Sequence, residues 1–105
     1  FSCGECQHGF LTGLLKNSGR YSVSSNRESG LGRSDIILKT HRVRDGMAMI
    51  LELKSAKKYS DMKSLCHQAL EQIEERDYAA SLRTEGYQNI KKYGICFYKK
   101  ECLVL

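Results

Sequence analysis

The stretch DIILKTHRVRDGMAMILELK, residues 35–54, decides the fold of this 105-residue chain. Residues 35–39 are rich in β-branched side chains and predict a strand. The turn signal RDG at 44–46 and the apolar segment 47–54 then predict the partner strand of a hairpin. The longest uninterrupted apolar run, 47–51, is far shorter than the roughly 20 residues of a spanning helix, so we expect no membrane segment.

Helical and strand patterns flank this hairpin on both sides, as judged from the spacing of apolar residues and from turn and capping signals. Before the hairpin they predict a helix at 6–16, a short strand at 21–23 and a polar loop or strand-end bend at 25–34. After it they predict a long helix capped by Ser60, a break near Asp77 and a second helical segment at 78–85 capped by Gly86. Strands at 90–98 and 102–105 complete the chain.

A strand, a crossover helix and a further strand are typical of an α/β layer. We therefore predict one α/β domain over residues 1–105, with a central mixed β-sheet flanked by a helix on each face, in the order α-β-β-β-α-β-β. The chain begins at Phe1 and shows no secretion signal, which predicts a fragment of a longer protein.

The charge balance favours an anionic partner. Lys and Arg number 17 against 12 Asp and Glu, a net charge of +5, and nucleic acid is the commonest partner of such chains. The five cysteines are an odd number, which favours a reducing compartment, so we expect a cytoplasmic protein. Cys3 and Cys6 form one Cys-x-x-Cys, but no second pair completes a structural zinc site.

Two acids and a lysine are expected to converge at one edge of the hairpin. Glu52 and Lys54 are two residues apart on a strand and share a face. Pairing Lys39 with Met49 would bring Asp35 close to Lys54 and within a residue or two of Glu52. Adjacent carboxylates favour a cation, and oxygen ligands suit Mg²⁺ or Mn²⁺, with the lysine beside it to orient or deprotonate water. On spacing alone, the alternative is an ordinary Glu52–Lys54 ion pair.

The order Asp35, sixteen residues, then Glu52-x-Lys54 resembles the PD-(D/E)XK nuclease superfamily. Ser34 takes the place of the superfamily's signature proline, which is often absent. The likeness points to a bacterial branch in which an AAA-ATPase-like region precedes a C-terminal PD-(D/E)XK domain, and it implies a restriction-endonuclease-like fold. It extends over essentially the whole chain, through ECQHGF (5–10), SNRESGLGRSDI (25–36), ALEQI (69–73) with Tyr78, and GICFYK (94–99).

The resemblance implies a role for each matching residue of the hairpin. Asp35 and Glu52 match the metal-binding acids, and the backbone carbonyl of Leu53 matches a further ligand. Lys54 matches the lysine that positions the attacking water. The expected activity is Mg²⁺- or Mn²⁺-dependent hydrolysis of DNA, including structure-specific cleavage as in junction resolvases. The alternative is a DNA-binding or protein-interaction module that keeps the fold without cleaving.

Two further polar residues match catalytic positions of the superfamily. Glu5 matches a helical acid that contacts the metal or water, although a solvated helix residue would look the same in sequence. Gln72 lies at the edge of the apolar stripe of its helix and should point toward the sheet, where an acid–metal site would supply its partners. The alternative for Gln72 is an amide bonded to backbone.

Basic residues and the chain end predict how the protein meets its partners. The strand at 102–105, CLVL, carries no polar residue at its end, so we expect its edge to pair in a homodimer, with a monomeric nicking domain as the alternative. Lysine pairs often only solvate a surface, but near an acid site they can contact phosphates. The expected DNA contacts are Arg27, Arg33, Lys57, Lys58, Lys91 and Lys92.

Overall fold

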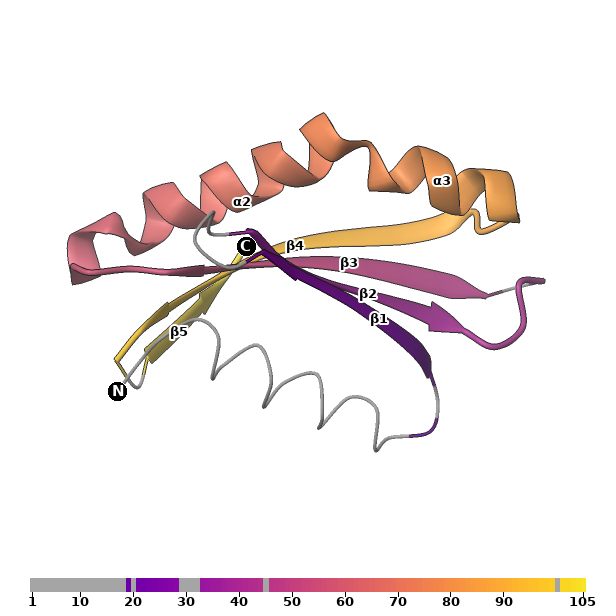
Figure 1. The fold of residues 1–105 in the computed structure, drawn as a ribbon, viewed down its shortest axis with the longest axis horizontal. Helices are drawn as coiled ribbons and strands as arrows, with labels where there is room; N and C mark the ends of the chain where they lie inside the picture. Colours follow the sequence, from indigo (N-terminus) through magenta and orange to yellow (C-terminus); the bar gives the residue numbers. More distant parts are fainter. Residues whose placement is uncertain (1–18, 20, 29–32, 45, 100) are drawn as a thin grey trace.

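The computed structural model describes residues 19, 21–28, 33–44, 46–99 and 101–105, so the helix expected at 6–16 lies outside the described residues. Within these ranges, no helix is long and apolar enough to cross a membrane. Figure 1 shows the elements in chain order, which are β1 (Tyr21–Glu28), β2 (Arg33–Thr40), β3 (Met47–Ser55), the 3₁₀ turn η1 (Tyr59–Asp61), α2 (Met62–Arg76), α3 (Tyr78–Glu85), β4 (Asn89–Tyr98) and β5 (Glu101–Val104).

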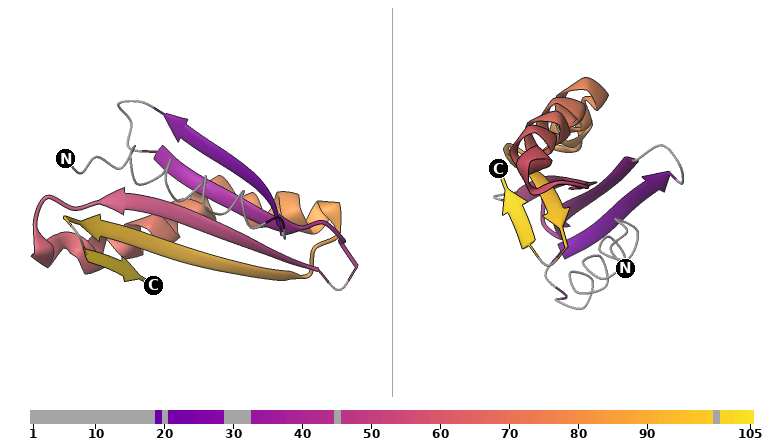
Figure 2. Two further views of the ribbon diagram at one scale, coloured as in Figure 1. Left: turned by 90° about the horizontal axis from the view of Figure 1, so that it is seen from below. Right: turned by 90° about the vertical axis from the view of Figure 1, so that its left-hand side faces the viewer.

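The strands form one mixed sheet in the order β1-β2-β3-β4-β5. Neighbouring strands are antiparallel except for β3 and β4, which are parallel. Parallel neighbours need a crossover, which η1, α2 and α3 supply. Figures 1 and 2 show both helices on one face of the sheet. The right-hand view of Figure 2 shows that β1 and β2 lie to one side of the helices. The predicted α/β fold with a mixed sheet is confirmed, while the helix expected on the other face lies outside the described part.

Side chains on both faces of β3 are buried. The face beneath α2 and α3 holds Ala48 and Ile50, which pack with Ile73 of α2. The opposite face holds a second cluster that includes Ile36 of β2 and Leu51 of β3. A strand buried on both sides is continuously apolar instead of alternating, which explains the run that begins β3.

Several element boundaries differ from the sequence prediction. The loop expected at 25–34 is wrong at both described ends, because β1 continues to Glu28 and β2 begins at Arg33. A polar sequence can form this strand because β1 lies at the edge of the sheet and pairs only with β2 there. Its exposed side chains, such as Ser22 and Ser24, can therefore be polar. The Ser60 cap is also wrong: η1 includes Ser60, and Asp61 immediately precedes α2.

A sharp bend separates α2 from α3. Asp77 has φ 54° and ψ 40°, in the left-handed region, and its N–H donates to the carbonyl of Glu74. Gly86 ends α3 with φ 111°. The predicted break near Asp77 and the predicted cap at Gly86 are both confirmed. The bend leaves Arg76 and Tyr78 on either side of it, at the adjoining ends of the two helices.

Candidate active site

Asp35 of β2 and Glu52 of β3 are direct partners across the two strands. Both residues have 0% exposure. Their same-face neighbours two residues away, Ile37 and Ile50, belong to the core beneath the helices, so the two acids point to that face. Burying two carboxylates together is unfavourable, because desolvation and mutual repulsion both disfavour the charged forms. The pair therefore requires cations or hydrogen-bond donors around it.

The register predicted from the sequence is wrong by one residue. Lys39 lies opposite Ala48 and not opposite Met49. Because side chains alternate along a strand, the predicted register would have turned Asp35 to the face away from Glu52. The observed register keeps the apolar side chains of both strands on matching faces and sets the two acids opposite one another. The predicted convergence of the acids is therefore found, through a different pairing.

Arg76, the last residue of α2, brings a positive charge to both acids. Its Nη1 donates a hydrogen bond of 2.8 Å to Glu52 Oε1 and lies 3.7 Å from Asp35 Oδ2. Among the described residues, Glu52 therefore pairs with Arg76, and not with Lys54 as in the simple strand-end ion pair. Sequence analysis missed Arg76, because its contact depends on where α2 ends above the sheet. The available signal was its four-residue spacing from Gln72, which sets both on one helix face.

Tyr78, the first residue of α3, donates a second hydrogen bond to the acid pair. Its hydroxyl lies 2.8 Å from Asp35 Oδ2. Tyr78 and Arg76 flank the left-handed residue Asp77, so a single bend delivers both donors. Tyr78 is among the matched residues of the resemblance, but no role in the site was predicted for it.

Lys54 follows Glu52 by two residues on β3 and points to the same face. Burial lowers the pKa of the Lys54 ammonium, an effect that the nearby Glu52 charge opposes and the Arg76 charge adds to. Burial likewise raises the pKa of the Glu52 carboxyl, and the charge and hydrogen bond of Arg76 offset this only in part. Both groups are thus shifted toward their neutral forms. Such paired shifts are typical of functional sites.

Glu52 and Gln72 each have one buried side-chain oxygen that bears on metal binding. Gln72 lies one helical turn before Arg76 on α2. In the part of the chain that the structure describes, Glu52 Oε2 and Gln72 Oε1 are buried and have no hydrogen-bond partner. A buried acceptor without a donor is costly, and a cation or a water molecule would satisfy it. Among the described residues, no backbone N–H donates to the Gln72 oxygen, and the alternative of an amide bonded to backbone stays a prediction for its NH2 group.

The donor set fits a small divalent cation. The described residues contain no group of three or more His, Cys, Asp or Glu side chains that could hold a metal by themselves. Mg²⁺, however, is usually held by one or two carboxylates together with waters and substrate phosphates. Asp35 and Glu52 lie opposite one another, and one Glu52 oxygen has no donor in the described part of the chain, so the two acids meet this requirement.

Gly94 allows α2 to lie directly on the sheet beside the acids. Gly94 of β4 is the strand partner of Glu52. A Cβ atom at Gly94 would lie 2.3 Å from the carbonyl oxygen of Cys66 and 3.1 Å from the Cβ of Ala69, both on α2. The absence of a side chain therefore brings α2 close enough to bury Glu52.

Four lysines predicted to contact DNA are placed by the structure. Lys57 and Lys58 are exposed in the connection that follows β3, and Lys91 is exposed on β4. Lys92 forms an ion pair with Glu74 of α2, which gives it a contact within the protein. The first three are therefore available to a ligand at the surface.

The remaining predicted site residues are Glu5, Arg27, Arg33 and Leu53. Glu5 lies outside the described residues. Arg27 of β1 is the strand partner of Ser34, and Arg33 of β2 is the strand partner of Glu28. The side chain of Leu53 lies in the core on the face opposite the acids, and its backbone adjoins Glu52.

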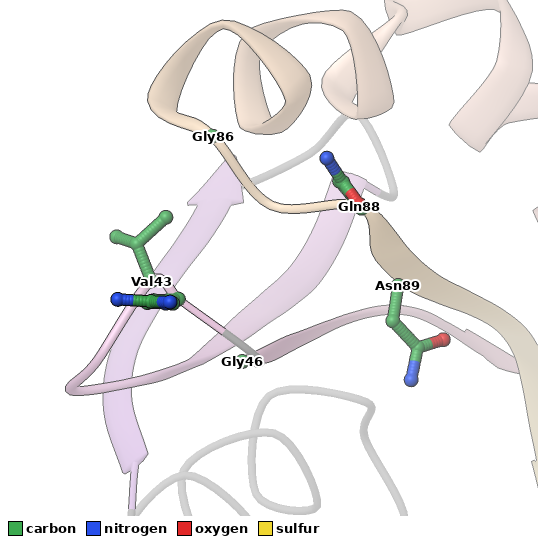
Figure 3. Close-up of a pocket in the computed structure, with 6 residues that line it drawn as sticks. Val43, Gly46, Gly86, Gln88 and Asn89 are labelled. Atoms are coloured by element: carbon green, nitrogen blue, oxygen red, sulfur yellow. The ribbon is translucent and has the colours of Figure 1, made fainter.

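The hollow drawn in Figure 3 lies away from the acid pair. It has a volume of about 420 Å³, and Val43 and Gly46 of the β2–β3 connection line it together with Gly86 and Asn89 near the end of α3. Gly46 directly precedes β3, whereas Glu52 lies six residues further along, a span of roughly 20 Å. This hollow is therefore separate from the candidate active site.

A family model of the PD-(D/E)XK nuclease superfamily matches residues 5–105. The match includes both buried acids and every helix and strand described above. The chain therefore belongs to the PD-(D/E)XK nuclease superfamily, and its helix-covered mixed sheet is consistent with the restriction-endonuclease-like fold. No curated protein and no solved structure matches the sequence.

Proposed function

We propose that this protein is a divalent-metal-dependent nuclease that hydrolyses phosphodiester bonds in DNA. The observation that carries the proposal is the buried, directly opposed pair Asp35 and Glu52 in a chain of the nuclease superfamily. Lys54, on the same strand face as Glu52, adds a titratable group with a lowered pKa. A buried acid pair beside an amine, with the pKa of Glu52 raised and that of Lys54 lowered, is expected where a site is built for chemistry.

The acids are the proposed ligands of Mg²⁺ or Mn²⁺. Asp35 and Glu52 would bind the ion through carboxylate oxygens, with the Leu53 carbonyl as a further ligand. The Gln72 oxygen, buried and without a donor among the residues that the structure describes, supports a contact to the ion or to a water molecule on it, and Glu5 is proposed for a similar contact. A divalent cation bound here polarises the scissile phosphate and lowers the pKa of water.

Lys54 is the residue that we propose to orient the attacking water. In the hydrolysis, the water oxygen forms a bond to phosphorus, the bond from phosphorus to the 3′-oxygen breaks, and the departing oxygen takes up a proton. Because burial lowers the pKa of Lys54, a larger fraction of its amine is neutral, and therefore able to accept a proton from the water, than in an exposed lysine.

Nucleic acid is the proposed substrate class, supported by the superfamily and by the net charge of +5. Lys92 is the weakest of the candidate contacts, since Glu74 already pairs with it. The proposed phosphate contacts are Arg27, Arg33, Lys57, Lys58, Lys91 and Lys92.

A homodimer with two sites is part of the proposal, because one acid cluster cuts one strand and symmetric cleavage of a junction needs two. The support is that β5 is an edge strand of the sheet, with Val104 50% exposed. We also propose a cytoplasmic location, from the odd cysteine count, and an ATPase-like region in the parent chain, from the sequence resemblance.

The second candidate is a module on the same fold that binds nucleic acid or protein without cleaving. The observation that favours it is the Arg76 ion pair, which partly neutralises the acids without a metal. A cleavage assay separates the two candidates.

The assay uses supercoiled plasmid, a four-way junction and single-stranded DNA, each with Mg²⁺, with Mn²⁺ or with EDTA. The proposal expects cleavage of at least one substrate with metal, none with EDTA, and loss of cleavage in Glu52→Gln. Metal-independent cleavage would contradict the mechanism. Binding of these DNAs without cleavage in either metal would favour the non-cleaving module.

A further inference from the structure

One guanidinium contacts both buried acids. Nη1 of Arg76 lies 2.8 Å from Glu52 Oε1 and 3.7 Å from Asp35 Oδ2. We infer that Arg76 is an internal counter-ion that competes with the divalent metal for the acid pair and is displaced when the metal binds. This inference rests on the metal site of the proposed function, and it adds a residue that sets the metal affinity.

The contact with Arg76 leaves one oxygen of Glu52 without a donor among the described residues. Glu52 Oε2 is buried and has no hydrogen-bond partner among the described residues, although Oε1 of the same carboxyl is bonded to Arg76. Burial raises the pKa of Glu52, and the charge and hydrogen bond of Arg76 offset this only in part. A divalent cation would bring more positive charge than Arg76 and could bind the Glu52 oxygen that has no donor among the described residues.

The guanidinium and a metal ion would exclude one another at this position. Two positive groups about 4 Å apart repel strongly once water is excluded, so the acids cannot keep Arg76 in place and also hold a divalent cation at full strength. Arg76 has a route out of the site, since its side chain is 26% exposed, whereas both acids are fully buried. It is also the last residue of α2, beside the bend at Asp77.

Tyr78 keeps the acids in position when Arg76 leaves. Its hydroxyl is uncharged and donates to Asp35 Oδ2 at 2.8 Å, so a metal ion has no electrostatic reason to expel it. The two residues on either side of Asp77 therefore have different roles. Tyr78 orients Asp35 in both states, and Arg76 neutralises the acids only in the metal-free state.

The test is a calorimetric titration of the metal-free chain with Mn²⁺, without DNA. Arg76→Met removes the charge and keeps most of the side-chain volume, and Arg83→Met, at an exposed arginine of α3, is the matched control. Arg76→Met should bind Mn²⁺ about tenfold more tightly than the wild type, the order expected when a charge-assisted hydrogen bond no longer has to be broken. Arg83→Met should leave the dissociation constant unchanged.

A stability measurement gives a second readout that does not depend on activity. In EDTA, Arg76→Met should unfold at a lower temperature than the wild type, and saturating Mn²⁺ should raise its melting temperature by more than it raises that of the wild type. If Arg76→Met does not fold without metal, Arg76→Gln replaces it and must show the same tightening.

Two failures are distinguishable. If the wild type binds Mn²⁺ and Arg76→Met binds it equally or more weakly, Arg76 is not a competitor and the inference is wrong, while the metal site stands. If neither the wild type nor Arg76→Met binds Mn²⁺, the metal site of the proposed function is itself wrong, and this inference is overturned with it.

Discussion

Asp35 and Glu52 face one another across β2 and β3 with both side chains fully buried. The sheet supplies these acids, and the bend between α2 and α3 supplies the two donors that contact them, Arg76 and Tyr78. The site is therefore assembled from parts far apart in the sequence. A core strand pair positions the acids, and the adjoining helix ends provide the guanidinium and the hydroxyl that contact them.

Lys54→Ala should abolish cleavage and spare DNA binding, because Lys54 lies in the acid site and not on the exposed surface. Loss of a group that orients or deprotonates the water lowers the rate about 100-fold or more. Single-turnover cleavage and a binding titration on one duplex measure the two effects. The control is Lys57→Ala, at an exposed lysine, which should weaken binding and leave the rate at saturation unchanged. Equal loss of rate and affinity in Lys54→Ala would make Lys54 a binding residue.

Gly94→Ala should destabilise the fold and damage the site together. The new Cβ would lie 2.3 Å from the backbone oxygen of Cys66, so α2 must move away from β4. Overpacking of this kind costs about 1–3 kcal/mol in the free energy of unfolding, which urea titration measures. Gln68→Ala, on the exposed side of α2, is the control and should change stability little. A fully stable Gly94→Ala protein would show that α2 does not pack as described.

Glu52→Gln should gain stability relative to the wild type as the pH rises. Burial raises the pKa of Glu52 above its ordinary value of 4.5, so between pH 4.5 and the raised pKa the folded state binds more protons than the unfolded state. The free energy of unfolding of the wild type therefore falls as the pH rises through this window, and Glu52→Gln lacks that loss.

Urea unfolding in EDTA, from about pH 4.5 to about pH 8, measures the difference between the two proteins. Glu75→Gln, at an exposed position of the same helix that carries Arg76, serves as the control. A stability difference between Glu52→Gln and the wild type that does not change with pH would show that the Glu52 carboxyl is not desolvated as the structure indicates.

The edge strand β5 should mediate dimer formation. Light scattering at micromolar concentration should give about twice the monomer mass of 11.9 kDa. Val104→Lys places a charge on the exposed edge and should return the protein to a monomer, whereas Val43→Lys, at an exposed valine of the β2–β3 connection, should not. If the wild type stays near the monomer mass with DNA and metal added, the dimer is wrong, and any activity should appear as nicks in plasmid.

The central hairpin could be predicted from sequence because its signals are local. The apolar run that begins at Met47 and the turn signal ending at Gly46 identify β3 and its antiparallel partner. The register could not be read in the same way, because it depends on the geometry of the connecting turn and on which face each strand buries. The one-residue error for Lys39 has that origin.

The donors around the acids could not be predicted from local pattern. Arg76 and Tyr78 contact the site only because Asp77 adopts a left-handed conformation and α2 ends above Glu52. The break near Asp77 is visible in the sequence, but the direction of the chain after it is a property of packing. Gly94 is similar, since its close approach to α2 is visible only in three dimensions.

The most direct test of the account is Mn²⁺ binding to the metal-free protein, measured by calorimetry on the wild type and on Glu52→Gln. The account predicts saturable binding by the wild type and a dissociation constant at least about tenfold weaker in Glu52→Gln, since one of the two carboxylate ligands is lost. Circular dichroism on both proteins establishes that each is folded. Equal heats in the two folded proteins, or no binding by either the wild type or Arg76→Met, would contradict a metal site between Asp35 and Glu52.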